Sequence, residues 1–207
     1  MNLQLALDVL SSEKAISLAR ATQDYVDIIE IGTPLVKHEG IHIIKELRKA
    51  FPDKTIFVDL KTMDVGEYEA DFCFENGADI VSVLAVAHIE TIKGSIKSAR
   101  KHNTHVLVDM INHPNKVQRA TEVVEAGADF IGVHSGIDQQ KMGISPLDDL
   151  KEISKTTNIP IFVAGGINLS NIGDIKDENP NTIIVGGAIT ALDNPALAAK
   201  KIKKHIA

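Results

Sequence analysis

The chain has 207 residues, of which 44% are hydrophobic, and its formal net charge at pH 7 is -6. This length suits one well-filled core and is short for two, so we expect a single domain spanning residues 1–207. The acidic balance and the lack of any basic run argue against nucleic acid or an anionic membrane surface as the main partner. A small anionic substrate is compatible with this net charge if a local arrangement of donors binds it.

Three features indicate a protein of the reducing cytoplasm. The longest apolar run, Ile159 to Ile167, is far shorter than a membrane span. The apolar start, Met1 to Leu7, has no basic leader and is too short for a signal-peptide core, so we expect it to be a strand. Cys73 is the only cysteine and cannot form an intramolecular disulfide, which favours a small buried hydrophobe.

Short β-prone runs alternate eight times with segments of helical periodicity. The predicted strands are Leu3 to Leu7, Val26 to Ile31, Thr55 to Val58, Ile80 to Leu84, His105 to Val108, Phe130 to Val133, Ile159 to Ala164 and Thr182 to Val185. The predicted helices include Glu13 to Ala21, Ile41 to Lys49, Val65 to Asn76, Ile89 to Lys101 and Val117 to Glu125.

The strand pattern and an internal sequence repeat favour a barrel. Several strands are almost wholly apolar, which is typical of parallel strands covered on both faces. The stretch Gly77 to Val83 recurs as Gly127 to Val133, fifty residues later, as expected for repeated β/α units. We therefore predict an α/β fold, a small (β/α)8 TIM barrel. A doubly wound open sheet ranks second, because Asp8 to Ser11 lacks a glycine fingerprint.

Ionisable side chains stand at the ends of five predicted strands. They are Asp8, Glu30, Asp59 with Lys61, Asp109, and His134. The carboxyl ends of the strands carry the chemistry of a TIM barrel, and unpaired charges are expensive to bury. We therefore predict an active site there. Glu30 and Asp59 together could hold one hard divalent ion, magnesium or alternatively manganese, and leave positions for substrate oxygens.

A glycine pair follows each of the last two predicted strands. The pairs are Gly165-Gly166 and Gly186-Gly187, each before an expected helix start. Exposed N-H groups at a helix start can bind a phosphate dianion without lysine or arginine. Strands seven and eight are also where TIM barrels commonly bind phosphate. We predict that these four glycines bind the phosphate group of a substrate.

The run Asp59-Leu60-Lys61-Thr62-Met63-Asp64, with Glu30, His134 and the glycine pairs, resembles the orotidine monophosphate decarboxylase superfamily. Within it, the chain resembles the 3-hexulose-6-phosphate synthase family along its whole length. The resemblance implies a homodimeric aldehyde-lyase that condenses formaldehyde with D-ribulose 5-phosphate to D-arabino-3-hexulose 6-phosphate, using magnesium and no Schiff base. It implies that Glu30 and Asp59 ligate the metal and that His134 handles the proton. It also implies that Asp64 reaches across the dimer interface into the partner's site.

The chemistry adds roles to this set. We expect Lys61 to stabilise the oxyanion of an enediolate intermediate, while Asp8 and Asp109 position substrate hydroxyls. A lysine flanked by Asp59 and Asp64 should stay charged, which argues against a Schiff-base aldolase. The polar segment from Gly136 to Pro146 is the expected mobile cover of the site.

Two other functions compete with the synthase. A 3-keto-L-gulonate 6-phosphate decarboxylase would carry arginines where this chain has Ile137 and Gly187, and usually glutamate in place of Asp109. Orotidine decarboxylases normally have Ile-Pro where this chain has Val65-Gly66. A non-catalytic sugar-phosphate binding protein would need neither the carboxylates nor the histidine.

Overall fold

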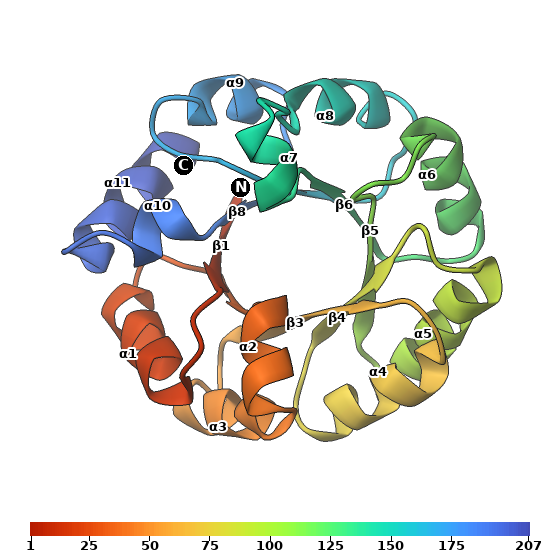
Figure 1. The fold of residues 1–207 in the computed structure, drawn as a ribbon, viewed down its shortest axis with the longest axis horizontal. Helices are drawn as coiled ribbons and strands as arrows, with labels where there is room; N and C mark the ends of the chain where they lie inside the picture. The colour runs from red at the N-terminus through yellow and green to blue at the C-terminus, as the bar shows by residue number, and fades with distance from the viewer.

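The computed structural model describes all residues from Met1 to Ala207. Eight parallel strands lie in chain order around a closed barrel, and β8 pairs with β1 to close it (Figure 1). The strands are β1 Asn2–Leu7, β2 Ile28–Ile31, β3 Thr55–Thr62, β4 Ile80–Leu84, β5 His105–Asp109, β6 Phe130–His134, β7 Ile161–Ala164 and β8 Thr182–Val185. The (β/α)8 prediction is confirmed, and the open sheet is excluded.

Helices surround the barrel, and all five that the periodicity predicted are present. The helices are α1 Ser12–Thr22, α2 Thr33–Glu39, α3 His42–Ala50, α4 Gly66–Glu75, α5 Ile89–His102, α6 Lys116–Glu125, α7 Ile137–Lys141, α8 Leu147–Ile153, α9 Ile172–Asp177, α10 Gly187–Thr190 and α11 Pro195–Ile206. Figure 1 shows the short helices α2, α7 and α10 inside the outer ring. Each follows a strand directly and precedes a helix of the outer ring, so these three helices lie at the carboxyl end of the barrel.

The turn residues explain where several helices begin and end. Ser11 is the N-cap of α1, and its hydroxyl accepts a hydrogen bond from the backbone N-H of Lys14. Gly77 and Gly127, which follow α4 and α6, have φ angles of 101° and 95°. Few residues other than glycine adopt this conformation, so these glycines allow the chain to leave each helix and enter the next strand.

The apolar core has two parts. A cluster of 49 buried residues fills the space between the strands and the helices. A second cluster lies apart from it and consists of Ile28, Phe57, Ile80, Leu107 and Phe162, one residue from each of five strands. Phe57 and Phe162 stack with their ring centroids 6.4 Å apart. This second cluster fills the barrel interior beneath the charged strand ends.

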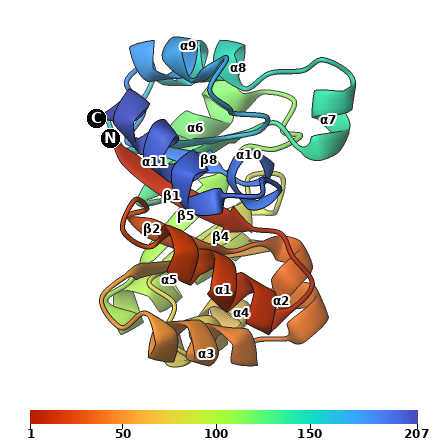
Figure 2. The same cartoon turned by 90° about the vertical axis from the view of Figure 1, so that its left-hand side faces the viewer.

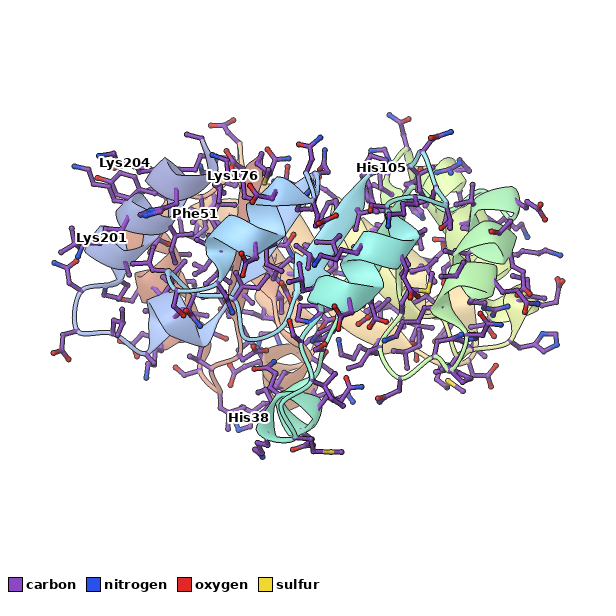
Figure 3. All side chains as sticks on the ribbon, turned by 90° about the horizontal axis from the view of Figure 1, so that it is seen from above. His38, Phe51, His105, Lys176, Lys201 and Lys204 are labelled. Carbon is purple, nitrogen blue, oxygen red and sulfur yellow. The ribbon has the colours of Figure 1, made fainter.

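The two ends of the barrel differ clearly. In Figure 3, His38, in the last turn of α2, lies on the side from which α7 projects, and His105, the first residue of β5, lies on the opposite side. Figure 2 shows α7 standing away from the body of the barrel and the two termini side by side. None of the helices is both long and apolar enough to cross a membrane.

Candidate active site

A cavity of about 820 Å³ lies at the carboxyl ends of the strands. Every predicted site residue except Asp64 lines it. These residues are Asp8, Glu30, Asp59, Lys61, Asp109, His134, Gly165, Gly166, Gly186 and Gly187. The fold therefore brings together side chains from strands far apart in the sequence.

The end of β3 differs from the prediction. The strand continues to Thr62 rather than ending at Val58, and its pairing with β4 shifts register between these two residues. Lys61 lies in this irregular stretch with a φ of 50°, a conformation that few residues other than glycine adopt. Its ammonium Nζ lies 2.7 Å from Oδ2 of Asp59 and 3.0 Å from Oδ2 of Asp109. The irregular strand end thus places Lys61 between two carboxylates.

These carboxylates fix the charge of Lys61. Burial alone would lower the pKa of Lys61, but Asp109 and Asp59 raise it well above its usual value. Burial alone would raise the pKa of Asp109, but His134 and Lys61 hold it well below its usual range. Lys61 is therefore a charged donor and a poor nucleophile, in agreement with the argument against a Schiff base.

Two hydroxyl groups that the sequence analysis missed hold Asp59. Thr33 Oγ1 donates to Oδ2 of Asp59 at 2.8 Å and to its carbonyl oxygen at 2.7 Å. Ser82 Oγ donates to Oδ1 at 2.7 Å. Both lie more than 20 residues from Asp59 in the sequence, and serine and threonine are common in strands and turns. No sequence signal could have singled them out.

His134 is oriented by Asp109. Its Nδ1 lies 3.0 Å from Oδ2 of Asp109, and Oδ1 of Asp109 accepts from the backbone N-H of Ile111 at 2.9 Å. An ionised carboxylate can only accept hydrogen bonds, so Nδ1 of His134 carries the proton that it donates. This leaves Nε2 as the basic nitrogen of a side chain that lines the cavity.

Glu30 of β2 and Asp8, which follows β1, add two more carboxyl groups to the cavity. Burial and then Asp59 raise the pKa of Glu30 to about 8, and the same two causes raise the pKa of Asp8. Gln4 Nε2 donates to Oε2 of Glu30 at 2.7 Å, and the sequence analysis missed this buried glutamine too. The side chain of Asp8 makes no hydrogen bond within the chain.

This donor set fits a divalent cation. Lys61 is the only lysine or arginine that lines the cavity, against the carboxylates of Asp8, Glu30, Asp59 and Asp109. No group of three or more histidine, cysteine, aspartate or glutamate side chains is arranged to hold a metal by itself. Magnesium commonly uses one or two carboxylates and takes its other ligands from water and substrate, so Glu30 and Asp59 suit this ion.

The glycine pairs present free donors to the cavity. The backbone N-H groups of Gly165, Gly166, Gly186 and Gly187 have no acceptor within the chain. Helix α10 begins at Gly187 as predicted, but α9 begins only at Ile172. The expected helix start after Gly165-Gly166 is therefore wrong. The φ angles of Gly165 and Gly166, 117° and 67°, instead produce an irregular turn that exposes its donors.

The predicted cover of the site contains a short helix. The segment from Gly136 to Pro146 is not all loop, because α7 occupies part of it. Gln140 of α7 donates from Nε2 to the carbonyl oxygen of Ser135 at 2.8 Å, which ties the helix to the end of β6.

Asp64 is exposed outside the cavity, where Oδ1 accepts from the N-H of Val65. The chain does not bring Asp64 into its own site.

With this geometry in place, sequence comparison identifies the family. The family model for orotidine 5'-phosphate decarboxylase / HUMPS matches residues 1–202. The chain belongs to this family. It is 44% identical to 3-hexulose-6-phosphate synthase of Mycobacterium gastri, over 100% of both chains. The predicted resemblance is confirmed.

Solved structures support the same branch. The 3-hexulose-6-phosphate synthase of Salmonella typhimurium superposes with a TM-score of 0.97 at 40% identity, covering 100% of this chain and 98% of that one. The 3-keto-L-gulonate-6-phosphate decarboxylase of Vibrio cholerae gives 0.87 at 29% identity, with coverage of 100% and 98%. Both share the fold, and the synthase is nearer in sequence.

Proposed function

We propose that this protein is a 3-hexulose-6-phosphate synthase, which condenses formaldehyde with D-ribulose 5-phosphate to give D-arabino-3-hexulose 6-phosphate and catalyses the reverse cleavage. The observation that carries this function is the hydrogen-bonded set of Asp59, Lys61, Asp109 and His134 in one cavity. A base, a fixed ammonium and carboxylates for a cation are what an enediolate reaction needs. A protein that only binds a sugar phosphate needs none of them.

The glycine pairs and the carboxylates bind different parts of the substrate. The free N-H groups of Gly165, Gly166, Gly186 and Gly187 bind the phosphate. Asp8, which has no partner in the chain, accepts from a substrate hydroxyl. Glu30 and Asp59 would hold magnesium, which would supply a Lewis acid to stabilise negative charge on the substrate oxygens.

His134 and Lys61 carry the first step. His134 removes the proton from C1 of ribulose 5-phosphate through Nε2, and the electron pair of that C-H bond forms the enediolate. Asp109 holds the imidazole by its Nδ1-H and stabilises the imidazolium that results. The ammonium of Lys61 has three N-H donors, of which Asp59 and Asp109 take two. The third donates to the enediolate oxygen.

The second step forms the carbon-carbon bond. C1 of the enediolate attacks the carbon of formaldehyde, and the ketone is restored at the adjacent carbon, which becomes C3 of the product. The formaldehyde oxygen becomes an alkoxide, which takes the proton back from His134. Every atom and electron pair is accounted for without an oxidant or a covalent enzyme adduct.

The cavity also favours the synthase over the sister decarboxylase. No arginine lines it, and Ile137 and Gly187 occupy the positions where arginines would be expected in a decarboxylase. A decarboxylase releases carbon dioxide from an anionic substrate carboxylate, for which arginine is the matching partner. Formaldehyde carries no charge and needs no arginine as a partner.

We also propose a homodimer in which Asp64 completes the site of the partner. Asp64 lies on the surface between β3 and α4, beside the exposed apolar side chains of Met63, Val65 and Tyr68. Exposed apolar residues gathered in one short segment are typical of a protein interface. Burying this segment against a second copy would explain both the apolar surface and a motif aspartate outside its own cavity.

The function is tested by assaying the purified protein with formaldehyde and ribulose 5-phosphate, with added magnesium and with excess chelator. We expect metal-dependent loss of formaldehyde and formation of a hexulose phosphate. Release of carbon dioxide from 3-keto-L-gulonate 6-phosphate without formaldehyde consumption would instead assign the sister activity. Failure of both reactions, and of metal-dependent proton exchange at C1, would favour a binding protein.

A further inference from the structure

Ser82, in the middle of β4, has no exposed surface and does not line the cavity, yet its hydroxyl forms hydrogen bonds with both Asp59 and Lys61 at the end of β3. The backbone N-H of Lys61 donates to Ser82 Oγ at 3.0 Å. The same Oγ donates to Oδ1 of Asp59 at 2.7 Å. One hydroxyl therefore links the main chain of Lys61 to the carboxylate of Asp59.

This link lies where β3 leaves regular geometry. The pairing between β3 and β4 shifts between Val58 and Thr62, and Lys61 has a φ of 50°. A backbone N-H in a shifted stretch has lost its ladder acceptor, and leaving it unpaired in the interior is expensive. The Ser82 hydroxyl accepts from it, and so holds the backbone conformation that aims the Lys61 side chain at Asp59 and Asp109.

We infer that Ser82 is a positioning residue, which sets the Asp59 carboxylate and the Lys61 ammonium relative to each other for metal binding and oxyanion stabilisation. The inference rests on the proposed synthase function. Ser82 does not touch the substrate. It acts by consuming one lone pair of Oδ1 of Asp59, so that the carboxylate keeps one orientation, and by fixing the turn of backbone that carries Lys61.

A purely structural role for Ser82 predicts different effects of its replacement. If Ser82 only satisfied the N-H of Lys61, replacing it would lower the free energy of unfolding and leave the turnover of the folded enzyme unchanged. The glycine pairs follow β7 and β8 and do not contact Ser82. If Ser82 is a positioning residue, its replacement should therefore lower kcat while the KM for ribulose 5-phosphate stays nearly constant.

The test compares Ser82→Thr with Ser82→Val, which match in size and differ by the hydroxyl. Three quantities are measured: kcat, KM for ribulose 5-phosphate at saturating magnesium, and the magnesium dissociation constant of the substrate-free protein by calorimetry. We expect the valine variant to lose about 10- to 100-fold in kcat and about 10-fold in magnesium affinity, as for other residues that orient metal ligands. The threonine variant should stay close to the wild type.

Equal kcat and equal magnesium affinity in the folded threonine and valine variants would overturn the inference. If the extra methyl group prevents folding of both, Ser82→Ala decides: a folded alanine variant with wild-type kcat and magnesium affinity overturns it, and a loss in both supports it. A wild-type protein that consumes no formaldehyde would defeat the proposed function instead. The magnesium affinities of the variants would still decide the role of Ser82.

Discussion

Asp109 is the residue on which the base and the ammonium both depend, because its Oδ2 accepts from His134 and from Lys61. In an Asp109→Asn variant, the amide can donate to Nδ1 of His134 and stabilise the wrong tautomer, and Lys61 loses one of its two counter-charges. We expect kcat to fall about 100- to 10,000-fold, the range associated with loss of general base catalysis. The measurements are steady-state formaldehyde consumption and proton exchange at C1.

Asp138 supplies the control for this prediction. It also borders the cavity, but its side chain is 96% exposed and pairs only with Lys141. An Asp138→Asn variant should retain wild-type kcat. If Asp109→Asn exchanged the C1 proton at the wild-type rate, the tautomer argument would be wrong.

The sequence predicted the charged residues of the site because charge at a strand end is rare and chemically expensive. Asp8, Glu30 and His134 stood out for that reason. Gln4, Thr33 and Ser82 did not, since a neutral amide or hydroxyl in a strand or turn has many harmless uses. Their roles exist only through partners at least 21 residues away, and the barrel alone brings them together.

At the scale of elements, Gly66 permits the close packing of α4 against α5. A Cβ at this position would lie 2.0 Å from the carbonyl oxygen of Thr91 and 2.7 Å from Oγ of Ser95. A backbone oxygen cannot move aside without shifting its helix. We expect Gly66→Ala to lower the free energy of unfolding by about 3 kcal/mol, measured by urea denaturation.

The matched control is a glycine inside another helix. A Cβ at Gly173 of α9 would meet no atom within 4 Å. Because alanine is the better helix former, Gly173→Ala should raise the free energy of unfolding by about 0.5 to 1 kcal/mol. A Gly66→Ala protein as stable as the wild type would show that the two helices can separate freely.

Asp71 joins the same two helices and gives them a pH dependence. Its carboxylate accepts from Ser98, Lys101 and His102 of α5, and the hydrogen bonds from Ser98 and Lys101 lower its pKa to about 2. A carboxylate with a lowered pKa stabilises the fold fully above its unfolded value near 4, and this stabilisation is lost as the pH falls toward 2.

We therefore expect Asp71→Asn to lower the free energy of unfolding by about 1 kcal/mol at pH 7, with a difference from wild type that shrinks below pH 4. Urea titrations across this range measure it. Glu67→Gln is the control, since Glu67 of α4 pairs with the exposed Lys97 and should matter by less than about 0.5 kcal/mol. A difference that stayed constant down to pH 2 would rule out the ionised carboxylate as its cause.

Length decided which elements the sequence could predict. Helices of nine residues or more show their periodicity, and all of these except the C-terminal α11 were among the helices predicted by range. Helices α2, α7 and α10 have seven, five and four residues, too few for a period of 3.6 to show. The extension of β3 was missed for another reason, because its last residues pair through a register shift that no local pattern encodes.

The whole molecule was predictable from one regularity, the eightfold alternation of apolar strand and helix, because few architectures accommodate eight parallel strands. The same regularity says nothing about assembly. Asp64 lies among exposed apolar side chains, which are Met63 and Val65 of the turn after β3 and Tyr68 in the first turn of α4. Whether that aspartate acts in its own site or in the site of a neighbouring chain depends on how two chains associate.

Two inactive variants can decide this point. Asp64→Asn and His134→Ala are produced together with different affinity tags, and the species that carries both tags is purified. In this mixed dimer, one site combines His134 of the first chain with Asp64 of the second and is intact, while the other site has lost both residues. We therefore expect about half of the wild-type activity per dimer, because a two-fold dimer has two equivalent sites.

The alternatives predict different results. If Asp64 acted within its own chain, each site of the mixed dimer would lack one residue and the species would be as inactive as either parent. If the protein were a monomer, no species with both tags would be recovered. A wild-type dimer that carries both tags controls for the effect of the tags. Recovery of activity from two inactive chains would require that the catalytic unit is the dimer, since neither chain alone holds a complete set of residues.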